Sequence, residues 1–228
     1  MRVAVVVPVF GNAATLPELV DRLAAALTGH DWTVRLVVDG SPDDSAAVAA
    51  RLAAADARVV PDVLPHNVGQ HRALATGLAA EAQAAAWVCL DADLQDPPEA
   101  VPLLLDRLAA GDVAAVFAGR RGAYEGALRL LTGRLHRAVL GRLTGLPPDA
   151  GAFLALDARA RTAVLRRAAP SLVAAVGAAR LPVASLPVER APRPSGSSAW
   201  TARARLRQSV RTLAWAARAR GSSGGQSG

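Results

Sequence analysis

The residues most able to do chemistry form the run Asp91-Ala92-Asp93-Leu94-Gln95-Asp96-Pro97-Pro98-Glu99. They follow the apolar segment 87–90, which we expect to be a buried strand. Two carboxylates one residue apart at a strand end point to the same side of the sheet, and their oxygens suit a hard divalent cation that shares its shell with phosphate. The alternative, an acidic turn that caps a helix, accounts for 96–99 but not for two acids on the strand side. The spacing therefore favours a metal–phosphate site.

The first half of the chain alternates between strand and helix patterns, which indicates how this acidic run is positioned. We expect strands at 3–9, 34–38, 58–63 and 86–90, and helices at 16–27, about 45–54, and 69–82. This order predicts an α/β fold with a mostly parallel central sheet and helices on both faces. Ligands bind such sheets at the carboxyl ends of the strands. Segments 8–10, 39–41 and 91–93 all follow predicted strands, so we expect them to form one site.

The second half is less regular. We expect a helix at 101–110, a strand at 113–118 followed by Gly119-Arg120-Arg121, helices at 128–143 and 159–167, and strands at 149–156 and 182–188. A Pro/Ser/Gly-rich loop covers 191–198, and 200–220 is competent to form a helix. Residues 221–228 lack apolar side chains and are expected to be disordered. The domain boundaries we predict are 1–190, 191–220 and 221–228.

Composition narrows the functional classes. The single cysteine, Cys89, excludes a disulfide framework and indicates a reducing compartment, and no apolar run is long enough to cross a bilayer. Residues 1–110 carry 7 Arg against 14 acids, whereas 111–228 carry 19 Arg against 5. The basic half could meet nucleic acid, an anionic membrane surface or a phosphate-rich ligand. Arginines without interleaved aromatics disfavour nucleic acid, which we do not expect as a partner.

Seven segments together resemble the family 2 glycosyltransferases, in the branch that includes the dolichyl-phosphate mannose synthases and moves a sugar from a nucleotide to a polyprenyl phosphate. They occur in the family's order: VVVPVFGNAATLPELV (5–20), VVDGSPDDS (37–45), NVGQHRALATGL (67–78), DADLQDPPE (91–99), AGRR (118–121), PPDAGAF (147–153) and RAPRPSGSSAW (190–200). The acidic segment with its QDPPE extension is specific, and the others are weak taken singly.

The resemblance implies a GT-A fold over 1–190 with a Rossmann-like nucleotide-binding half, followed by a basic closing loop and helix. It implies Mg²⁺ or Mn²⁺ held by Asp93 and Gln95, with Asp93, Arg134 and Asp149 as catalytic candidates. The residues it implies around the nucleotide sugar are Pro8, Val9, Phe10, Asn12, Asp39, Asp91, Ala92, Arg120, Arg134 and Arg193. Arginine suits phosphate oxygens because its guanidinium is a planar fork. For Asp149, a role as a turn residue after two prolines is an equal alternative.

Three departures from the family pattern fall mainly on the acceptor side. Val38-Asp39 stands where two aspartates are usual, Gly151-Ala152-Phe153-Leu154 replaces GDFR, and Ala199-Trp200 replaces a Lys-Tyr pair. A phosphate acceptor tolerates Ala152 better than a hydroxyl acceptor, because a phosphate monoester with a second pKa near ~6 is already ionised and needs no base.

The sequence therefore predicts an inverting, metal-dependent transferase with a nucleotide-sugar donor (UDP or GDP) and a polyprenyl-phosphate acceptor. We expect a cytoplasmic protein, either free or peripheral on the cytoplasmic face of the membrane. Two alternatives stay open: a soluble acceptor, or a decayed protein that binds nucleotide sugars or acts as a membrane adaptor. The oligomeric state is not determined by the sequence.

Two further features allow two interpretations each. His71 and Arg72 follow Asn67-Val68-Gly69, either at a helix N-terminus that faces the nucleotide or in a helix simply capped by Asn67. In the last helix, one apolar stripe with arginines beside it suits either an anionic membrane surface or packing on the domain. The stripe consists of Leu206, Val210, Leu213 and Ala217. Trp32 and Trp87 are expected in the core.

Overall fold

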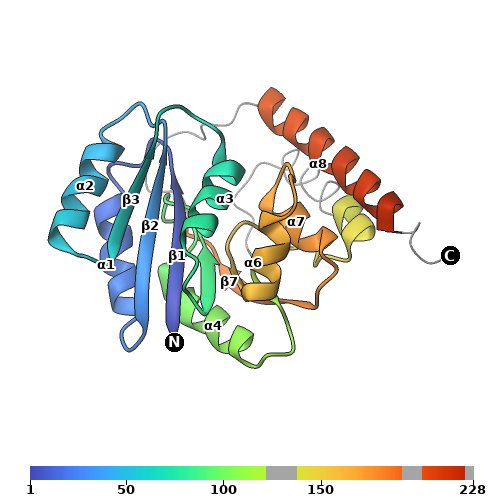
Figure 1. Cartoon of the computed structure of the whole chain (residues 1–228), viewed down its shortest axis with the longest axis horizontal. Helices are drawn as coiled ribbons and strands as arrows, with labels where there is room; N and C mark the ends of the chain where they lie inside the picture. Colours follow the sequence, from blue (N-terminus) through green and yellow to red (C-terminus); the bar gives the residue numbers. More distant parts are fainter. Residues whose placement is uncertain (122–137, 192–201, 224–228) are drawn as a thin grey trace.

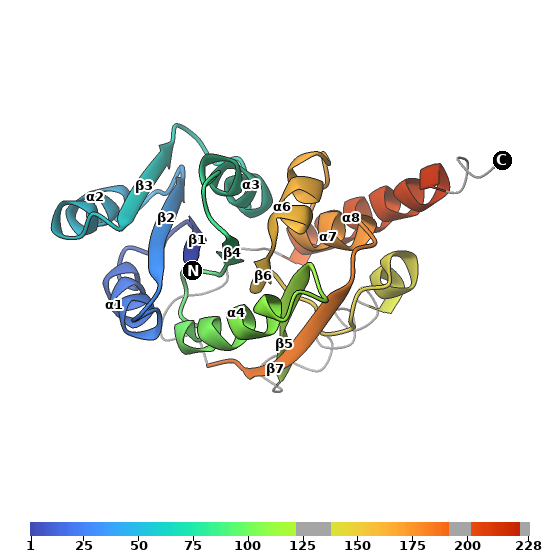
Figure 2. The ribbon, with the colours of Figure 1, turned by 60° about the horizontal axis from the view of Figure 1, so that its bottom comes forward.

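The structure is a computed structural model that describes residues 1–121, 138–191 and 202–223 (Figure 1). A seven-stranded sheet forms its centre, and helices cover both faces (Figure 2). The strands are β1 (Arg2–Val9), β2 (Asp31–Asp39), β3 (Val59–Leu64), β4 (Ala86–Cys89), β5 (Ala115–Arg121), β6 (Leu154–Leu156) and β7 (Val183–Glu189). The helices are α1 (Leu16–Ala26), α2 (Ser45–Ala55), α3 (Gln70–Ala80), η1 (Pro98–Ala100), α4 (Val101–Ala109), α6 (Ala158–Leu165), α7 (Leu172–Ala178) and α8 (Ala202–Ser223).

The strand order, β3-β2-β1-β4-β6-β5-β7, determines where a ligand can bind. Strand β6 is antiparallel to both of its neighbours, and the other pairings are parallel. The chain moves outward from β1 through β2 to β3 and then returns to place β4 on the other side of β1. This reversal is a topological switch point, and ligands bind outside the carboxyl ends of strands at such a point. The loops after β1 and β4 both start there.

The core has two layers because the sheet buries side chains on both faces. On one face Val5 and Val7 belong to the apolar cluster that includes α1, α2 and α4, and on the other Ala4 and Val6 belong to the cluster that includes α3, α6, α7 and α8. A strand buried on both sides reads as a continuous apolar run, which explains the valines of β1. Trp32 and Trp87 are each 2% exposed, as predicted.

Cys89 is a buried structural thiol. It ends β4 with no exposed surface, and burial raises the pKa of its thiol far above the ordinary value, with the nearby Asp91 adding to the effect. A thiol held in its protonated form is neither a nucleophile nor a metal ligand.

Several predicted elements differ from the observed ones. The strand predicted at 149–156 is only Leu154–Leu156, since Ala150 N donates to Pro147 O and turns the chain away from the sheet. Helix α7 was not predicted, because its segment LVAAVGA shows no amphipathic period, but Ser171 caps it through a bond from Ala174 N. Of the helix predicted at 128–143, the described residues 138–143 are helical, and the helix continues to residue 144.

Helix α8 is longer than predicted and presents a different face. It extends to Ser223, so the prediction of a disordered tail from residue 221 is wrong for the first three residues, and 224–228 lie outside the described chain. The predicted stripe is confirmed at Leu213, which packs on the core, but not at Val210, which is 59% exposed. Thr212 and Ala216 are buried instead, and Trp215 also packs on the core. Small side chains let the helix approach α7 closely, and this contact outweighs the weak stripe. In the described residues, no helix is long and apolar enough to cross a membrane.

Candidate functional site

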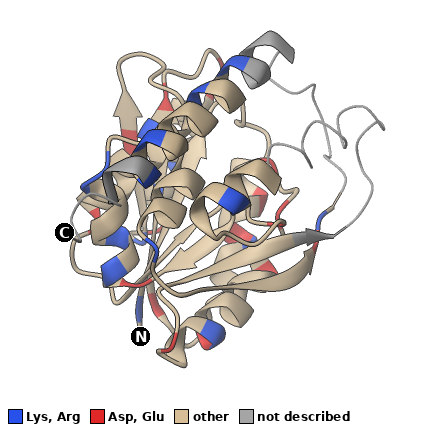
Figure 3. Ribbon diagram, turned by 90° about the vertical axis from the view of Figure 1, so that its right-hand side faces the viewer, with Lys and Arg blue, Asp and Glu red and all other residues tan. Residues whose placement is uncertain are grey.

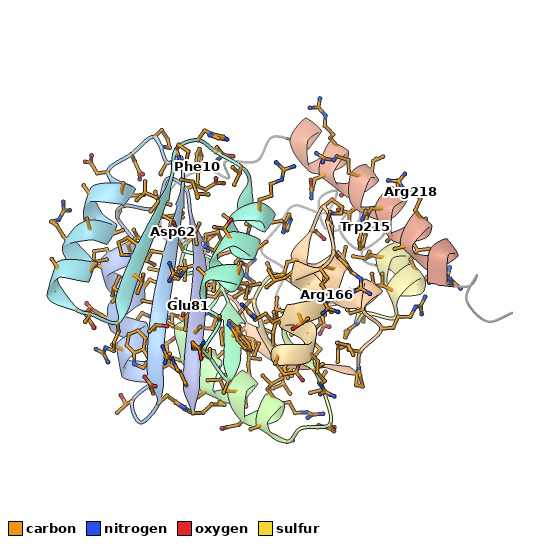
Figure 4. The ribbon with its side chains drawn as sticks, viewed as in Figure 1. Phe10, Asp62, Glu81, Arg166, Trp215 and Arg218 are labelled. Atoms are coloured by element: carbon orange, nitrogen blue, oxygen red, sulfur yellow. The ribbon has the colours of Figure 1, made fainter. Side chains whose placement is uncertain are left out.

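The loop after β1 is held against the loop after β2 by backbone donors. The N–H groups of residues 11–13 donate in order to Ser41 Oγ at 2.8 Å, Ser45 Oγ at 3.2 Å and Asp43 Oδ2 at 3.0 Å. Although burial alone would raise it, hydrogen bonds from Ser41, Ser45 and the backbone lower the pKa of Asp43 to about 2. Phe10, 39% exposed, lies at this edge of the sheet (Figure 4). The two loops therefore form one fixed rim.

Asp39 stabilises the same rim through hydrogen bonds to backbone N–H groups. It is 2% exposed, and its carboxylate accepts Val68 N at 2.6 Å and Gly69 N at 2.8 Å, which fixes the chain just before α3. Both oxygens are engaged, so a base or ribose contact would use their remaining lone pairs. The prediction that Asn67 caps α3 is wrong, because its side chain donates to Asp39 O at 3.2 Å and the N-cap is Gly69.

The spacing argument assumed that the acidic run continues a strand, but in the structure it does not. β4 ends at Cys89, and Asp91 to Gln95 form a turn in which Leu94 has φ +58°, a left-handed conformation that is rare for leucine. The alternation nevertheless persists, since Asp91, Asp93 and Gln95 are partly exposed while Ala92 and Leu94 are buried. The turn thus presents its three oxygen-bearing side chains outward at the carboxyl edge.

Neighbouring side chains hold this turn in place. Thr15 Oγ1 donates to Ala92 O at 2.6 Å, and Gln70 Nε2 donates to Asp91 Oδ1 at 2.5 Å. Within the turn, Gln95 N donates to Asp93 Oδ1 at 3.1 Å. The starts of α1 and α3 therefore both fix the acidic turn.

A buried ion pair supports the turn from behind, and sequence reasoning missed it. Arg190 Nε donates to Asp96 Oδ1 at 2.6 Å, with side-chain exposures of 16% and 2%, and Ala191 N donates to Gln95 O at 2.9 Å. Asp96 Oδ2 has no hydrogen-bond partner among the described residues. The sequence offered only an arginine after the last strand and an acid in a turn. Nothing in their 94-residue separation indicates a pair.

Asp149 lies against β5 and β7. Its Oδ1 accepts Ser185 Oγ at 2.9 Å, and a Cβ at Gly119 would collide with both of these side chains. Gly119 is therefore required for Asp149 to approach β5 one residue before Arg120. The turn after Pro147 that was the alternative for Asp149 is present, while its catalytic role stays a prediction.

His71 is partly buried near the start of α3, and the prediction that this helix end faces a nucleotide stays a prediction. Its Nδ1 accepts Leu172 N at 3.3 Å, which ties α3 to the start of α7. Burial lowers the pKa of His71 to about 4, so the imidazole is neutral at pH 7. Arg72, one residue later, is exposed.

The remaining predicted contacts divide into three groups. Pro8, Val9 and Ala92 are buried, so only their backbone atoms could contact a nucleotide, as expected for Pro8 and Val9, whereas Asn12 is partly exposed. Arg134 and Arg193 lie outside the described residues, and so does the side chain of Arg120. Their predicted phosphate contacts stay predictions.

The donor set at the turn suits a cation that shares its ligands. No group of three or more His, Cys, Asp or Glu able to hold a metal occurs within 1–121, 138–191 and 202–223. Two carboxylates and one amide oxygen cannot complete the shell of a hard divalent cation, but such a cation commonly keeps waters and substrate phosphates. The residues therefore fit Mg²⁺ or Mn²⁺ bound together with a diphosphate, and they do not form an all-protein cage.

Residues 4–152 match the family described as Glycosyl transferase family 2. The chain belongs to this family. It is 38% identical over 147 residues to an undecaprenyl-phosphate 4-deoxy-4-formamido-L-arabinose transferase of Sodalis glossinidius, covering 63% of this chain and 44% of that protein. The same-named protein of Pseudomonas fluorescens is 37% identical over 148 residues, with 63% and 42% covered. The chain thus spans less than half the length of these relatives.

Solved structures confirm the predicted GT-A fold. Glucosyl-3-phosphoglycerate synthase of Mycobacterium tuberculosis, in complex with Mn²⁺, UDP-glucose and phosphoglyceric acid, superposes with a TM-score of 0.72 at 19% identity, over 96% of this chain and 80% of that one. Mannosyl-3-phosphoglycerate synthase of Rubrobacter xylanophilus superposes at 0.65 and 20% identity, over 97% and 75%. At these identities the likeness establishes the fold alone.

Proposed function

We propose that this protein transfers a sugar from a nucleotide-sugar donor to a polyprenyl phosphate with inversion, using Mg²⁺ or Mn²⁺. The observation that carries the proposal is the turn 91–95, which turns Asp91, Asp93 and Gln95 outward at the switch point of the sheet. Both relatives compared above are named as undecaprenyl-phosphate sugar transferases, and this supports a polyprenyl phosphate as the acceptor. The Mn²⁺ and UDP-glucose named for the structural neighbour support a divalent metal and a nucleotide donor.

In this reaction the protein mainly binds and orients the donor and the acceptor, and little proton transfer is needed. Asp93 and Gln95 would hold the cation, which when bound neutralises charge on the departing diphosphate. An oxygen of the acceptor phosphate forms the new bond to the anomeric carbon as the bond to the diphosphate breaks, on opposite faces of the sugar. The acceptor is already ionised, so Ala152 in place of an acid is compatible with the reaction. The rim of residues 10–13 and 39–43 would receive the nucleoside.

The expected location is the cytoplasmic side, with the protein peripheral on the membrane where its acceptor resides. Arg207, Arg211 and Arg218 are exposed on α8, and they would favour an anionic surface. In the ribbon of Figure 3, the blue that marks Lys and Arg recurs along this helix.

Transfer of radiolabelled sugar from UDP- and GDP-sugars to polyprenyl phosphate in detergent, with Mg²⁺ or Mn²⁺, tests the proposal. We expect a lipid-linked sugar that disappears with EDTA and falls by at least ~100-fold in Asp93→Asn. Asp106→Asn, which removes an exposed acid of α4 outside the site, is the matched control and should keep full activity. No product with any donor, or equal activity in both variants, would refute it.

A second function, transfer to a soluble acceptor, is favoured by one observation. The neighbour of TM-score 0.72 is named with phosphoglyceric acid, a soluble phosphorylated compound, and it covers 96% of this chain. Offering 3-phosphoglycerate and polyprenyl phosphate in competition distinguishes the two functions. Donor binding with neither transfer to an acceptor nor hydrolysis of the donor would identify the decayed binding protein.

A further inference from the structure

A groove of about 650 Å³ lies between the start of α3, residues 167–170 and α8. Small or apolar side chains contribute to its wall from all three elements: Ala75, Ala169, Pro170, Ala214 and Trp215. Gln208 Nε2 donates to Pro170 O at 2.5 Å and closes one side. Trp215 and Arg218 extend from α8 in Figure 4. The groove is thus a built feature of the packing between α8 and the domain.

The groove carries a positive charge that the described residues do not balance. Four arginines line it, Arg72, Arg167, Arg211 and Arg218, and no Asp or Glu is among its lining residues. Arg167 donates to Ala163 O at 3.1 Å and to Ala178 O at 3.4 Å, but carbonyl oxygens do not neutralise it. None of the other three forms an ion pair with another described residue, and all are exposed. An anion in this groove would relieve their mutual repulsion.

The spacing of the arginines indicates what kind of anion fits. Arg211 and Arg218 are two turns apart on α8, which separates them by roughly 10 Å along the helix axis. Positive charges spread over this length suit the neighbouring headgroups of a bilayer. Val210, 59% exposed, also lines the groove next to Arg211, and it offers an apolar contact beside the charge. Phosphate next to hydrocarbon is the chemistry of a phospholipid surface.

We propose that this groove and the exposed arginines of α8 bind the headgroups of anionic phospholipids, and so place the protein on the membrane. The inference rests on the proposed function, in which the acceptor is a membrane lipid. This membrane contact differs from the one predicted from the apolar stripe. It would be made by the arginines and the groove, not by a row of apolar side chains. One end of the groove reaches Gly69 and Gln70, and Gln70 contacts Asp91, so binding would bring the bilayer surface near the acidic turn.

Vesicle co-sedimentation of the full chain tests the proposal, with phosphatidylcholine alone, with about 30 mol% phosphatidylglycerol added, and with polyprenyl phosphate added instead. Each arginine near such a surface contributes about 1 kcal/mol, or roughly fivefold in binding. Arg211→Gln/Arg218→Gln should therefore bind the anionic vesicles about 25-fold more weakly. Arg2→Gln/Arg51→Gln removes the same charge from exposed positions outside the groove and should change binding by less than about twofold.

Four results would overturn the proposal. They are no binding of the unaltered chain to anionic vesicles, equal weakening in both double variants, equal binding to vesicles of phosphatidylcholine alone, and binding that requires polyprenyl phosphate but ignores phosphatidylglycerol. The last would make the groove an acceptor site. Transfer by the unaltered chain in detergent is measured separately. If vesicle binding depends on the groove but the unaltered chain transfers no sugar, the proposed function is refuted and the proposed phospholipid site is not.

Discussion

Replacing Arg190 by methionine tests whether the buried ion pair behind the acidic turn holds the fold together. The change removes the guanidinium 2.6 Å from Asp96 Oδ1 and leaves a carboxylate that is 2% exposed without its counter-charge. An uncompensated buried charge costs about 3–5 kcal/mol, far more than a lost surface pair. With a slope near 2–3 kcal/mol/M in urea, the unfolding midpoint should fall by on the order of 1–2 M.

Two further variants separate the buried charge from other effects of the substitution. Arg22→Met removes a bidentate pair with Glu99, whose side chains are 30% and 57% exposed, and should cost less than about 1 kcal/mol. The double variant Arg190→Met/Asp96→Leu replaces the pair by apolar groups and should recover most of the loss. If Arg190→Met costs no more than Arg22→Met, or if the double variant is no more stable than the single one, the reasoning is refuted.

Two more stability predictions follow from the site. His71 has a pKa of about 4 in the fold against 6.5 when unfolded, so the unfolded chain takes up a proton more readily. The contribution of the neutral imidazole to the free energy of unfolding is therefore complete above pH 6.5 and is lost as the pH falls toward 4. The loss should reach about 2 kcal/mol at pH 5, measured by urea unfolding at pH 7 and pH 5, and it should be absent in His71→Gln. An equal change in the free energy of unfolding between the two pH values in both proteins would contradict this. Gly40 has φ +57° and a Cβ there would collide with the backbone of His66 and Asn67, so Gly40→Ala should cost about 2–4 kcal/mol. Gly29→Ala, at φ +91° in open space, should cost only about 1 kcal/mol, and similar thermal midpoints for the two variants would exclude the collision.

The first half of the fold was predictable because each of its signals is local. The apolar run 3–9 marks a strand buried on both faces, and the leucines of 16–27 mark a helix face, so the structure confirms both within a few residues. The acidic run was also found correctly as an exposed, oxygen-rich element at the carboxyl edge. Its conformation was not, because the turn, left-handed at Leu94, is held at Ala92 and Asp91 by Thr15 and Gln70, contacts that no local pattern encodes.

The features that escaped prediction depend on contacts between distant segments. Arg190 meets Asp96 only after β7 has been placed beside β5. The face that α8 buries combines Thr212 and Ala216 with Leu213 and Trp215, so it follows only part of the predicted stripe and leaves Val210 exposed. Helix α7 lacks a polar face because it is buried, so a periodicity argument had nothing to detect.

The three residues of β6 have a consequence for how the protein unfolds. Leu154–Leu156 lie between β4 and β5 and pair with both, so among the described strands they alone join the four strands of the amino-terminal half to β5 and β7. A seam only three residues long is where partial opening should begin, with each half retaining its own ladder. Amide hydrogen exchange should accordingly report faster opening at residues 154–156 than at residues 3–7 of β1, although both segments are fully buried.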